Sequence, residues 1–331
     1  MKKEEMYFAD LSLLIVAMLW GSTYVVTKNA LNSINLPLLL TFRFVIASTL
    51  MYILFKRKIG KITFSDLKKG SIVGVILFSG FLFINYGLIY TEASKQGFLV
   101  ATYVVIVPLM HWIIYKKMPQ IKFFIGSLLT IFGIGLITLQ NGFSLSFGDS
   151  LTLISAIFFA MHIISIEYFA KNMNIYKLAF LQFFICAILS IILVIFTKQL
   201  SFDFPSNTWY SIIYLAVIAT LFCFSTQTIA QKYTNSSHAS IIMSLESVFA
   251  AIFGIVFLNE VLTTIMIFGG FLIVTAVLII ELDIKALSRN CDFVTFHSTL
   301  RGFSTLKYNG NLNYFQSNRI FLVPLIPHFF Y

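Results

Sequence analysis

The chain has 331 residues, of which 59% are hydrophobic and 11% are charged, and its mean hydropathy is +0.90. A soluble fold of this length would have too few charged side chains for its surface, so the composition excludes an ordinary soluble protein and predicts a membrane protein. A net charge of +10 could suggest a nucleic-acid partner, but the positions of the basic residues argue against one.

Ten apolar stretches of about twenty residues follow one another from Phe8 onward. About twenty helical residues cross the ~30 Å hydrocarbon core of a bilayer, and a backbone in lipid must satisfy its polar groups internally, so each stretch predicts one transmembrane helix. The first is an uncleaved span rather than a signal peptide, because its apolar run continues to Val26 without a small-residue cleavage site. The predicted spans are residues 8–30, 36–55, 70–90, 96–115, 121–140, 148–170, 176–197, 208–231, 238–258 and 263–282.

Lysine and arginine are distributed unequally between the two sides of these spans. One set of alternate gaps, with the N-terminus and the segment after the tenth span, holds 16 of them, and the opposite gaps hold 3. Because cytoplasmic segments carry the excess of basic residues, we predict a multi-pass protein of the cytoplasmic (inner) membrane with both termini in the cytoplasm. The basic charge is then mainly a topology signal, and we expect no nucleic-acid partner.

The spans divide into two sets of five around a polar hinge at residues 141–144. The fourth and ninth spans start alike, with small and polar residues at 93–97 and 236–240, and we match Pro108 in the former with Ser247 in the latter. Because five is odd, the second copy must be inverted relative to the first, an arrangement typical of secondary transporters.

The sequence therefore predicts an all-α membrane protein of ten transmembrane helices in two inverted five-helix repeats, residues 8–140 and 148–282. The remaining segment, residues 286–331, is polar, aromatic and aperiodic. We interpret it as a cytoplasmic tail with little fixed structure.

Several ordered motifs resemble those of a known family. They are Leu19-Trp20-Gly21-Ser22-Thr23-Tyr24, Pro37-Leu38-Leu39-Leu40-Thr41-Phe42-Arg43-Phe44, Ser65-Asp66-Leu67, Pro108, Leu245-Glu246-Ser247-Val248 and Leu258-Asn259-Glu260. Together they resemble the EamA family of the drug/metabolite transporter superfamily. Two positions depart from that family's pattern: Ser247 stands where a proline is usual, and Lys116-Lys117-Met118 stands in place of an acidic residue at the end of the fourth span.

The resemblance implies ten spans, two inverted repeats and export of small metabolites, often amino acids or related solutes. We predict a secondary transporter that works by alternating access. A channel-like facilitator and a non-transporting membrane scaffold or sensor stay open as alternatives. The sequence has no nucleophile elbow, zinc-protease motif, phosphate loop or Cys/His cluster, so we predict neither an enzyme nor a metal or cofactor.

Two charged residues lie deep in predicted spans, where a charge is costly. Arg43 can bind a substrate carboxylate through its bidentate fork, or it can merely hold helices together. Glu246 can pair with Arg43, bind a substrate amine or carry a coupling proton. We hypothesise that both border one central cavity, directly paired in the empty carrier or separated by substrate.

Other polar residues within spans should face the bundle, because exposure to lipid is unfavourable. His162 can titrate near neutral pH or bond to a neighbouring helix. The predicted substrate-binding residues are Arg43, Glu246, Trp20, Tyr24, Asn85, Tyr86, Thr102, Tyr103, His162 and Gln227. We further predict gating roles for Gly21 and Pro108, and packing or homodimer contacts for the glycine-rich fifth and tenth spans.

The charge bias gives a direct test of orientation. A cysteine placed at Asn141 or Asn259 should react with a membrane-impermeant thiol reagent added outside intact cells, whereas a cysteine at Lys61 should not. The parent chain, with its own three cysteines, measures the background labelling. The opposite pattern would overturn the predicted orientation.

Overall fold

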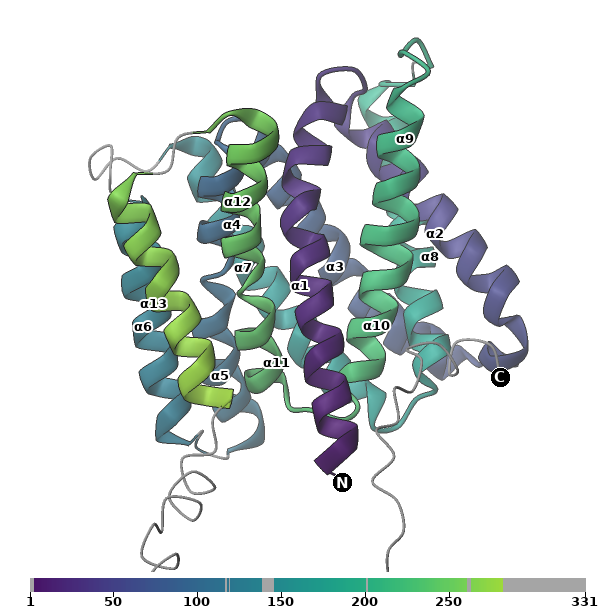
Figure 1. Cartoon of the computed structure of the whole chain (residues 1–331). Helices are drawn as coiled ribbons and strands as arrows, with labels where there is room; N and C mark the ends of the chain where they lie inside the picture. The colour runs from purple at the N-terminus through teal and green to yellow at the C-terminus, as the bar shows by residue number, and fades with distance from the viewer. Residues whose placement is uncertain are drawn as a thin grey trace, which may run out of the picture. The chain divides into compact units, whose positions relative to one another are not determined.

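The computed structural model describes residues 3–116, 118, 120–138, 146–200, 202–260 and 263–281. These residues form the bundle of helices in Figure 1, in which α1 runs through the centre and α6 and α13 lie together at one edge. The elements are α1 (Lys3–Leu31), α2 (Leu36–Ile59), α3 (Phe64–Ile89), α4 (Ala93–Val100), α5 (Tyr103–Tyr115), α6 (Ile121–Thr138), α7 (Phe147–Ala170), α8 (Ile175–Thr197), α9 (Thr208–Ile213), η2 (Tyr214–Phe222), α10 (Cys223–Ala230), α11 (Ser236–Met243), α12 (Glu246–Leu258) and α13 (Thr264–Glu281).

Each predicted span corresponds to a helical segment. Within the described ranges, eight segments are long and apolar enough to cross a membrane, and Ile121–Leu136 and Ile267–Ala276 are shorter apolar helices. The all-α membrane fold is therefore confirmed. The hinge at residues 141–144 and the tail at 286–331 lie outside the described residues.

Polar caps decide where several helices begin. In α3, Thr63 and Asp66 form a capping box, in which each side chain accepts a hydrogen bond from the other residue's backbone N–H. Ser146 and Asp149 form the same motif at the start of α7. The helix α3 begins at Phe64 on its cap, six residues before the predicted start of the third span at residue 70.

The fourth and ninth spans are each interrupted near the middle. Between α4 and α5 the interruption falls at Ala101 and Thr102, and between α11 and α12 it falls at Ser244 and Leu245. At both places the backbone switches to hydrogen bonds between residues three apart. Such discontinuous helices form the binding sites of many transporters with inverted repeats.

The interruptions align the two repeats. Tyr103 opens α5 ten residues after Ala93, and Glu246 opens α12 ten residues after Ser236. In this alignment Pro108 corresponds to Ala251, so its predicted match with Ser247 is wrong by four residues. Pro108 lies inside α5 rather than at the interruption.

The eighth span departs from the ordinary α-helix. Its middle turns form the π-helix η2, in which the Thr220 hydroxyl donates to the carbonyl of Leu215, five residues earlier, at 2.8 Å. In the same segment, the Ala219 carbonyl accepts a hydrogen bond from the indole Nε1 of Trp20 at 3.0 Å. This span thereby ties itself to α1. π-Helical turns occur often at functional sites.

Glycines permit the closest helix contacts around the centre of the bundle. A Cβ on Gly21 of α1 would lie 2.5 Å from the Cβ of Phe249, and one on Gly97 of α4 would lie 2.6 Å from the Cβ of Ala250. Both glycines thus let α1 and α4 pack against α12. The gating role of Gly21 stays a prediction, and the contact here is one of packing.

The fifth and tenth spans, α6 and α13, pack on each other as a pair. A Cβ on Gly133 would lie 2.6 Å from the carbonyl oxygen of Gly269, whereas one on Gly135 or Gly270 would meet no atom of the described residues within 4 Å. The predicted packing role is therefore seen between the two helices. The predicted homodimer stays a prediction.

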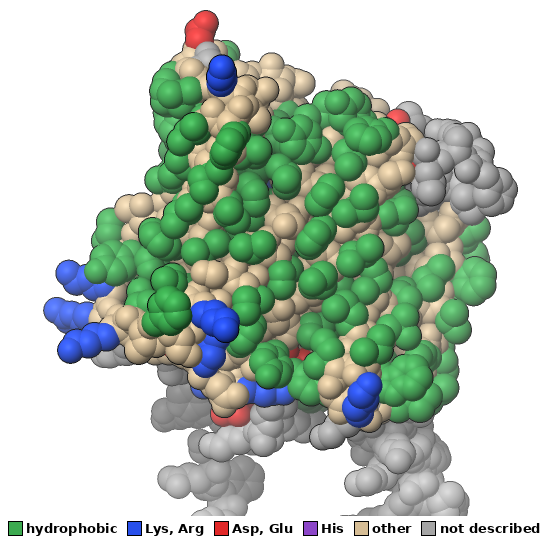
Figure 2. All heavy atoms as spheres, turned by 180° about the vertical axis from the view of Figure 1, so that it is seen from behind, with side chains coloured by type: hydrophobic (Ala, Val, Ile, Leu, Met, Phe, Trp, Pro, Cys, Tyr) green, Lys and Arg blue, Asp and Glu red, His purple; other side chains and the backbone are tan. Residues whose placement is uncertain are grey.

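The face shown in Figure 2 is broadly apolar, and most of its basic side chains lie toward the lower end. Large exposed side chains on the outside of the bundle include Ile53, Phe196 and Phe271. An apolar exterior of this kind suits contact with lipid chains.

The two glycines of α6 provide a matched test of this packing. Gly133→Ala should lower the free energy of unfolding in detergent by about 1–3 kcal/mol, because the added methyl group collides with the backbone of α13. Gly135→Ala should leave it unchanged or raise it by up to ~1 kcal/mol, because alanine favours the helix and has open space. Equal effects would show that α6 and α13 do not pack in this way.

Candidate functional site

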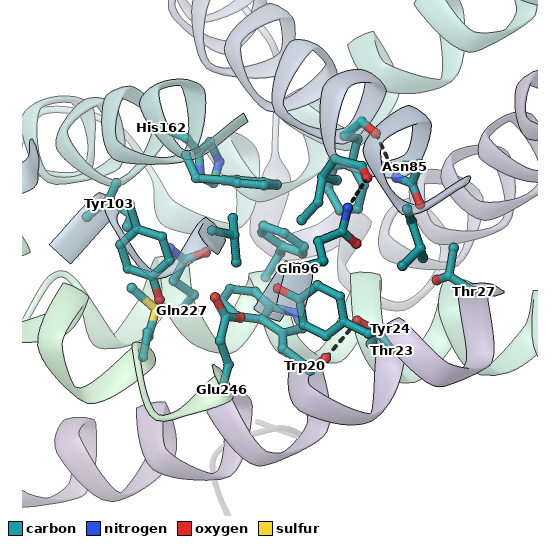
Figure 3. A pocket seen from close by; sticks show the side chains of 18 of the residues that line it. Trp20, Thr23, Tyr24, Thr27, Asn85, Gln96, Tyr103, His162, Gln227 and Glu246 are labelled. Atoms are coloured by element: carbon teal, nitrogen blue, oxygen red, sulfur yellow. Dashed lines mark hydrogen bonds between the residues drawn. The ribbon is translucent and has the colours of Figure 1, made fainter. Parts of the chain in front are cut away.

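A cavity of about 70 Å³ lies within the bundle, where the interrupted spans meet α1, α2, α3, α7 and α10. Its walls combine aromatic rings with a few polar groups (Figure 3). The structure brings together these predicted residues at its wall: Trp20, Tyr24, Arg43, Asn85, Tyr103, His162, Gln227 and Glu246. Thr102 and the two predicted gating residues, Gly21 and Pro108, do not line it.

The interruptions place one polar side chain from each repeat in the cavity. Tyr103 and Glu246 are the first residues of α5 and α12, and the Tyr103 hydroxyl points toward the Glu246 carboxylate (Figure 3). Glu246 is only 5% exposed. Its place in the first turn of α12 compensates part of the cost of burial, because the N-terminus of a helix favours a negative charge.

Arg43 lies at another part of the same wall and is 4% exposed. Its Nε donates to the Thr220 hydroxyl at 2.6 Å, and its Cζ lies 4.3 Å from the centre of the Phe81 ring. The π-helix positions Thr220 for this bond, and the ring stabilises the cation by about 1–2 kcal/mol. Within the described part of the chain, no carboxylate forms an ion pair with Arg43.

Among the described residues, Arg43 and Glu246 form no direct ion pair, and their separation by a substrate stays a prediction. Both side chains border one cavity, but each has its own local stabilisation. Thr220 and Phe81 hold Arg43, whereas the first turn of α12 and the nearby Tyr103 surround Glu246.

His162 adopts the bonded arrangement that the sequence left open. Its Nε2 lies 2.8 Å from the Oε1 of Gln182 on α8, and Gln182 Nε2 donates to the Thr228 hydroxyl at 3.4 Å. This chain of bonds joins α7, α8 and α10. His162 also lines the cavity, so it contributes both to helix contacts and to the wall.

Two glutamines present amide oxygens in this region. Gln96 donates to the Ile84 carbonyl at 2.6 Å and to the Thr152 hydroxyl at 3.1 Å, while its Oε1 has no partner among the described residues. The Oε1 of Gln227 is also buried without a partner there. Sequence reasoning missed Gln96, together with Thr23 and Thr27. Its signal is an amide inside the polar start of the fourth span, a segment that we use only to match the two repeats.

A second cavity of about 310 Å³ lies nearer the end of the bundle where α1 ends and α2 begins. Its polar lining includes Lys28, Asn32, Asn35 and Gln199, and Tyr86 lines this cavity rather than the central one. Leu88 lines both cavities. The predicted grouping of Tyr86 with the central residues is therefore not what the structure has.

Carboxylates cap both interrupted spans at their starts. Glu260 accepts hydrogen bonds from the backbone N–H groups of Ala93 and Ser94 at 3.2 and 3.1 Å, which caps α4. At the other end of the bundle, Glu167 of α7 accepts from the backbone N–H of Ser236, at 3.1 Å, and from its hydroxyl. These carboxylates satisfy N–H groups that would otherwise be orphaned at a helix start.

Glu167 also explains one of the departures in the sequence. Glu260 lies fourteen residues after Glu246, and the residue fourteen positions after Tyr103 is Lys117. The first repeat therefore lacks the matching acid in its own sequence. Glu167 supplies a carboxylate to α11 instead, with Lys171 Nζ 3.2 Å and His111 Nε2 3.5 Å from its Oε1.

Comparisons with known proteins agree with this architecture. A sequence profile described as the EamA-like transporter family matches residues 7–139 and 146–282. An uncharacterized transporter of Archaeoglobus fulgidus is 37% identical over 277 residues, which cover 84% of this chain and 87% of that relative. The uncharacterized transporter YoaV of Bacillus subtilis is 25% identical over 273 residues, covering 80% of this chain and 93% of that protein.

A solved crystal structure is similar in fold, with a TM-score of 0.66 at 16% identity. The similarity covers 82% of this chain and 96% of that one. At this identity the likeness concerns the fold alone.

The separation of the two buried charges gives a stability test. Because Arg43 and Glu246 do not form an ion pair with each other, Arg43→Gln and Glu246→Gln should each change the free energy of unfolding by no more than ~1 kcal/mol. In the double variant the two effects should add within about 0.5 kcal/mol. A direct buried pair would instead lose about 3–5 kcal/mol in each single variant and recover in the double. Thermal unfolding in detergent distinguishes the two outcomes.

Proposed function

Because the chain belongs to the EamA-like transporter family, we propose that it is a secondary transporter that exports small metabolites, amino acids or related solutes, across the cytoplasmic membrane by alternating access. The family is one of membrane transporters rather than enzymes. The observation that carries the proposal is the central cavity, whose wall holds a buried arginine and a buried glutamate with no ion pair between them among the described residues.

This pair of charges favours a zwitterionic solute. Nε makes the only hydrogen bond of the Arg43 guanidinium to the described residues, so its two Nη groups stay available to a substrate carboxylate. Glu246 offers a carboxylate to a substrate ammonium group. A zwitterion would neutralise both at once, whereas a simple anion or cation would leave one buried charge unmatched. The rings of Trp20, Phe81 and Phe224 supply apolar surface for the rest of the solute.

Alternating access requires that the central cavity widen and open toward each side in turn. At about 70 Å³ it is small beside the several hundred Å³ typical of ligand pockets, so the helices must separate to admit a metabolite. Leu88 lines both the central and the second cavity. With the N-terminus in the cytoplasm, as we propose, the second cavity would lie on the outer side of the central one.

Solute counterflow in reconstituted vesicles tests the proposal. Vesicles loaded with one unlabelled amino acid should transiently accumulate the same labelled amino acid, and the initial rate should saturate with concentration. Arg43→Gln and Glu246→Gln should each lower the rate at least about tenfold, because each removes a charged contact to the solute. Thr275→Val on α13 is the control, since Thr275 lies outside the cavity wall and the interrupted spans, and it should keep most of the activity.

Other outcomes identify the alternatives. A rate that rises without saturation would indicate a channel-like facilitator. Absence of flux for a full panel of zwitterionic solutes, in protein that unfolds at the normal temperature, would favour a scaffold or sensor. Normal counterflow in either cavity variant would show that the solute binds elsewhere.

A further inference from the structure

Basic side chains gather where α2 ends and α3 begins. Residues 56–69, here named the basic corner, contain six of them, Lys56, Arg57, Lys58, Lys61, Lys68 and Lys69. Figure 2 shows Lys and Arg side chains gathered at one lower corner of the molecule. The same fourteen residues contain a single acid, Asp66.

The basic corner has a fixed backbone. Gly60 ends α2 with a φ of 65°, which favours glycine, and Thr63 caps α3. Asn174 Nδ2 donates to the Lys58 carbonyl at 2.9 Å, and Lys177 Nζ donates to the Lys61 carbonyl at 2.7 Å. The start of α8 thus holds the turn in place, so a ligand would bind cations whose backbone is already ordered.

The charge of the basic corner is not neutralised internally. Asp66 is already engaged by Lys177, whose Nζ lies 2.8 Å from its Oδ2. None of the six basic side chains forms an ion pair with a carboxylate within the described ranges. Lys58 lies over the Tyr176 ring at 5.1 Å. Among the described residues, the other five side chains have neither a carboxylate nor an aromatic ring as a partner.

The inverted repeat shows that the turn itself does not need these cations. The equivalent connection after α8, residues 198–207, contains one basic residue, Lys198, and one acidic residue, Asp203. The same supersecondary connection is thus built with no net charge in the second repeat. Because the second copy is inverted, its connection faces the opposite side of the membrane, where the charge bias predicts few basic residues, so the comparison shows only that the turn can fold without these six cations.

Apolar side chains lie beside these cations. Tyr52, Ile53 and Leu54 are exposed on the last turns of α2 before the corner, and Phe64 is 85% exposed at the start of α3. This pairing of cations with an adjoining apolar surface matches the two parts of a phospholipid, an anionic headgroup and its acyl chains. We propose that the basic corner is a binding site for anionic phospholipid.

Lipid retention by the purified protein tests this proposal. The protein is titrated in neutral detergent with phosphatidylglycerol or with phosphatidylcholine, and bound lipid is counted by native mass spectrometry. Phosphatidylglycerol should bind more tightly, and raised salt should weaken it. The triple variant Arg57→Gln, Lys61→Gln, Lys68→Gln should lose on the order of a hundredfold in affinity for it.

A matched triple variant controls for net charge. Lys116→Gln, Lys122→Gln, Lys232→Gln removes three cations at the same end of the bundle, outside the basic corner, and should bind phosphatidylglycerol nearly as the parent does. Replacing Lys61 and Lys68 by arginine should preserve binding. If the glutamine triple fails to fold, the single variants Arg57→Gln and Lys68→Gln should each bind several-fold more weakly.

Three results would overturn the proposal. Equal retention of the two lipids would show that no anionic headgroup is selected. Equal loss in both triple variants would show that net charge alone acts. Displacement of the lipid by inorganic phosphate would show an anion site that needs no acyl chains.

Discussion

Interrupted backbone hydrogen bonding in the middle of two spans is the constraint on which the rest of this structure depends. A backbone at this depth must satisfy its polar groups within the protein, so a break can persist only where it is buried or lines a cavity. The breaks at Ala101 and Ser244 meet that condition because they lie in the bundle around one central cavity. They also set the chemistry of the cavity, because each delivers the first residue of the following half-helix, Tyr103 or Glu246, to its wall.

The same constraint acts at the outer starts of the interrupted spans. Each half-helix has N–H groups that no preceding turn can satisfy, and Glu260 and Glu167 accept their hydrogen bonds at opposite ends of the bundle. One carboxylate follows the interrupted span of its own repeat, whereas the other comes from α7. The first repeat has Lys117 where a matching acid would cap α11, but α11 is still capped, because Glu167 of α7 accepts these hydrogen bonds. Both repeats thus have a carboxylate cap at the start of the interrupted span, although the capping residue comes from a different position in each case.

The sequence predicts well those features that depend on transfer from water to lipid. Ten apolar stretches mark the spans, and the cost of a buried charge singles out Arg43 and Glu246, both of which line the cavity. It predicts poorly what depends on local backbone geometry. No proline or glycine stands at the break at Ala101, and Pro108 lies seven residues later inside α5. The π-helix around Thr220 has an ordinary apolar sequence that does not distinguish it from an α-helix. Gln96 was missed for the same reason, because the break decides which face of the span reaches the cavity.

Arg43 and Glu246 border one cavity without forming an ion pair, and this arrangement lowers the free-energy cost of binding a ligand between them. If Arg43 and Glu246 were paired, the empty protein would be locally neutral, and a solute would have to break that pair before binding. Here Thr220 and Phe81 hold the cation, and the first turn of α12 favours the anion. These contacts are weaker than an ion pair and leave both groups able to bind a ligand. The site is therefore less stable in the empty state than a paired one would be, as is common at functional sites. A solute with complementary charges would provide the ion pairs that Arg43 and Glu246 lack.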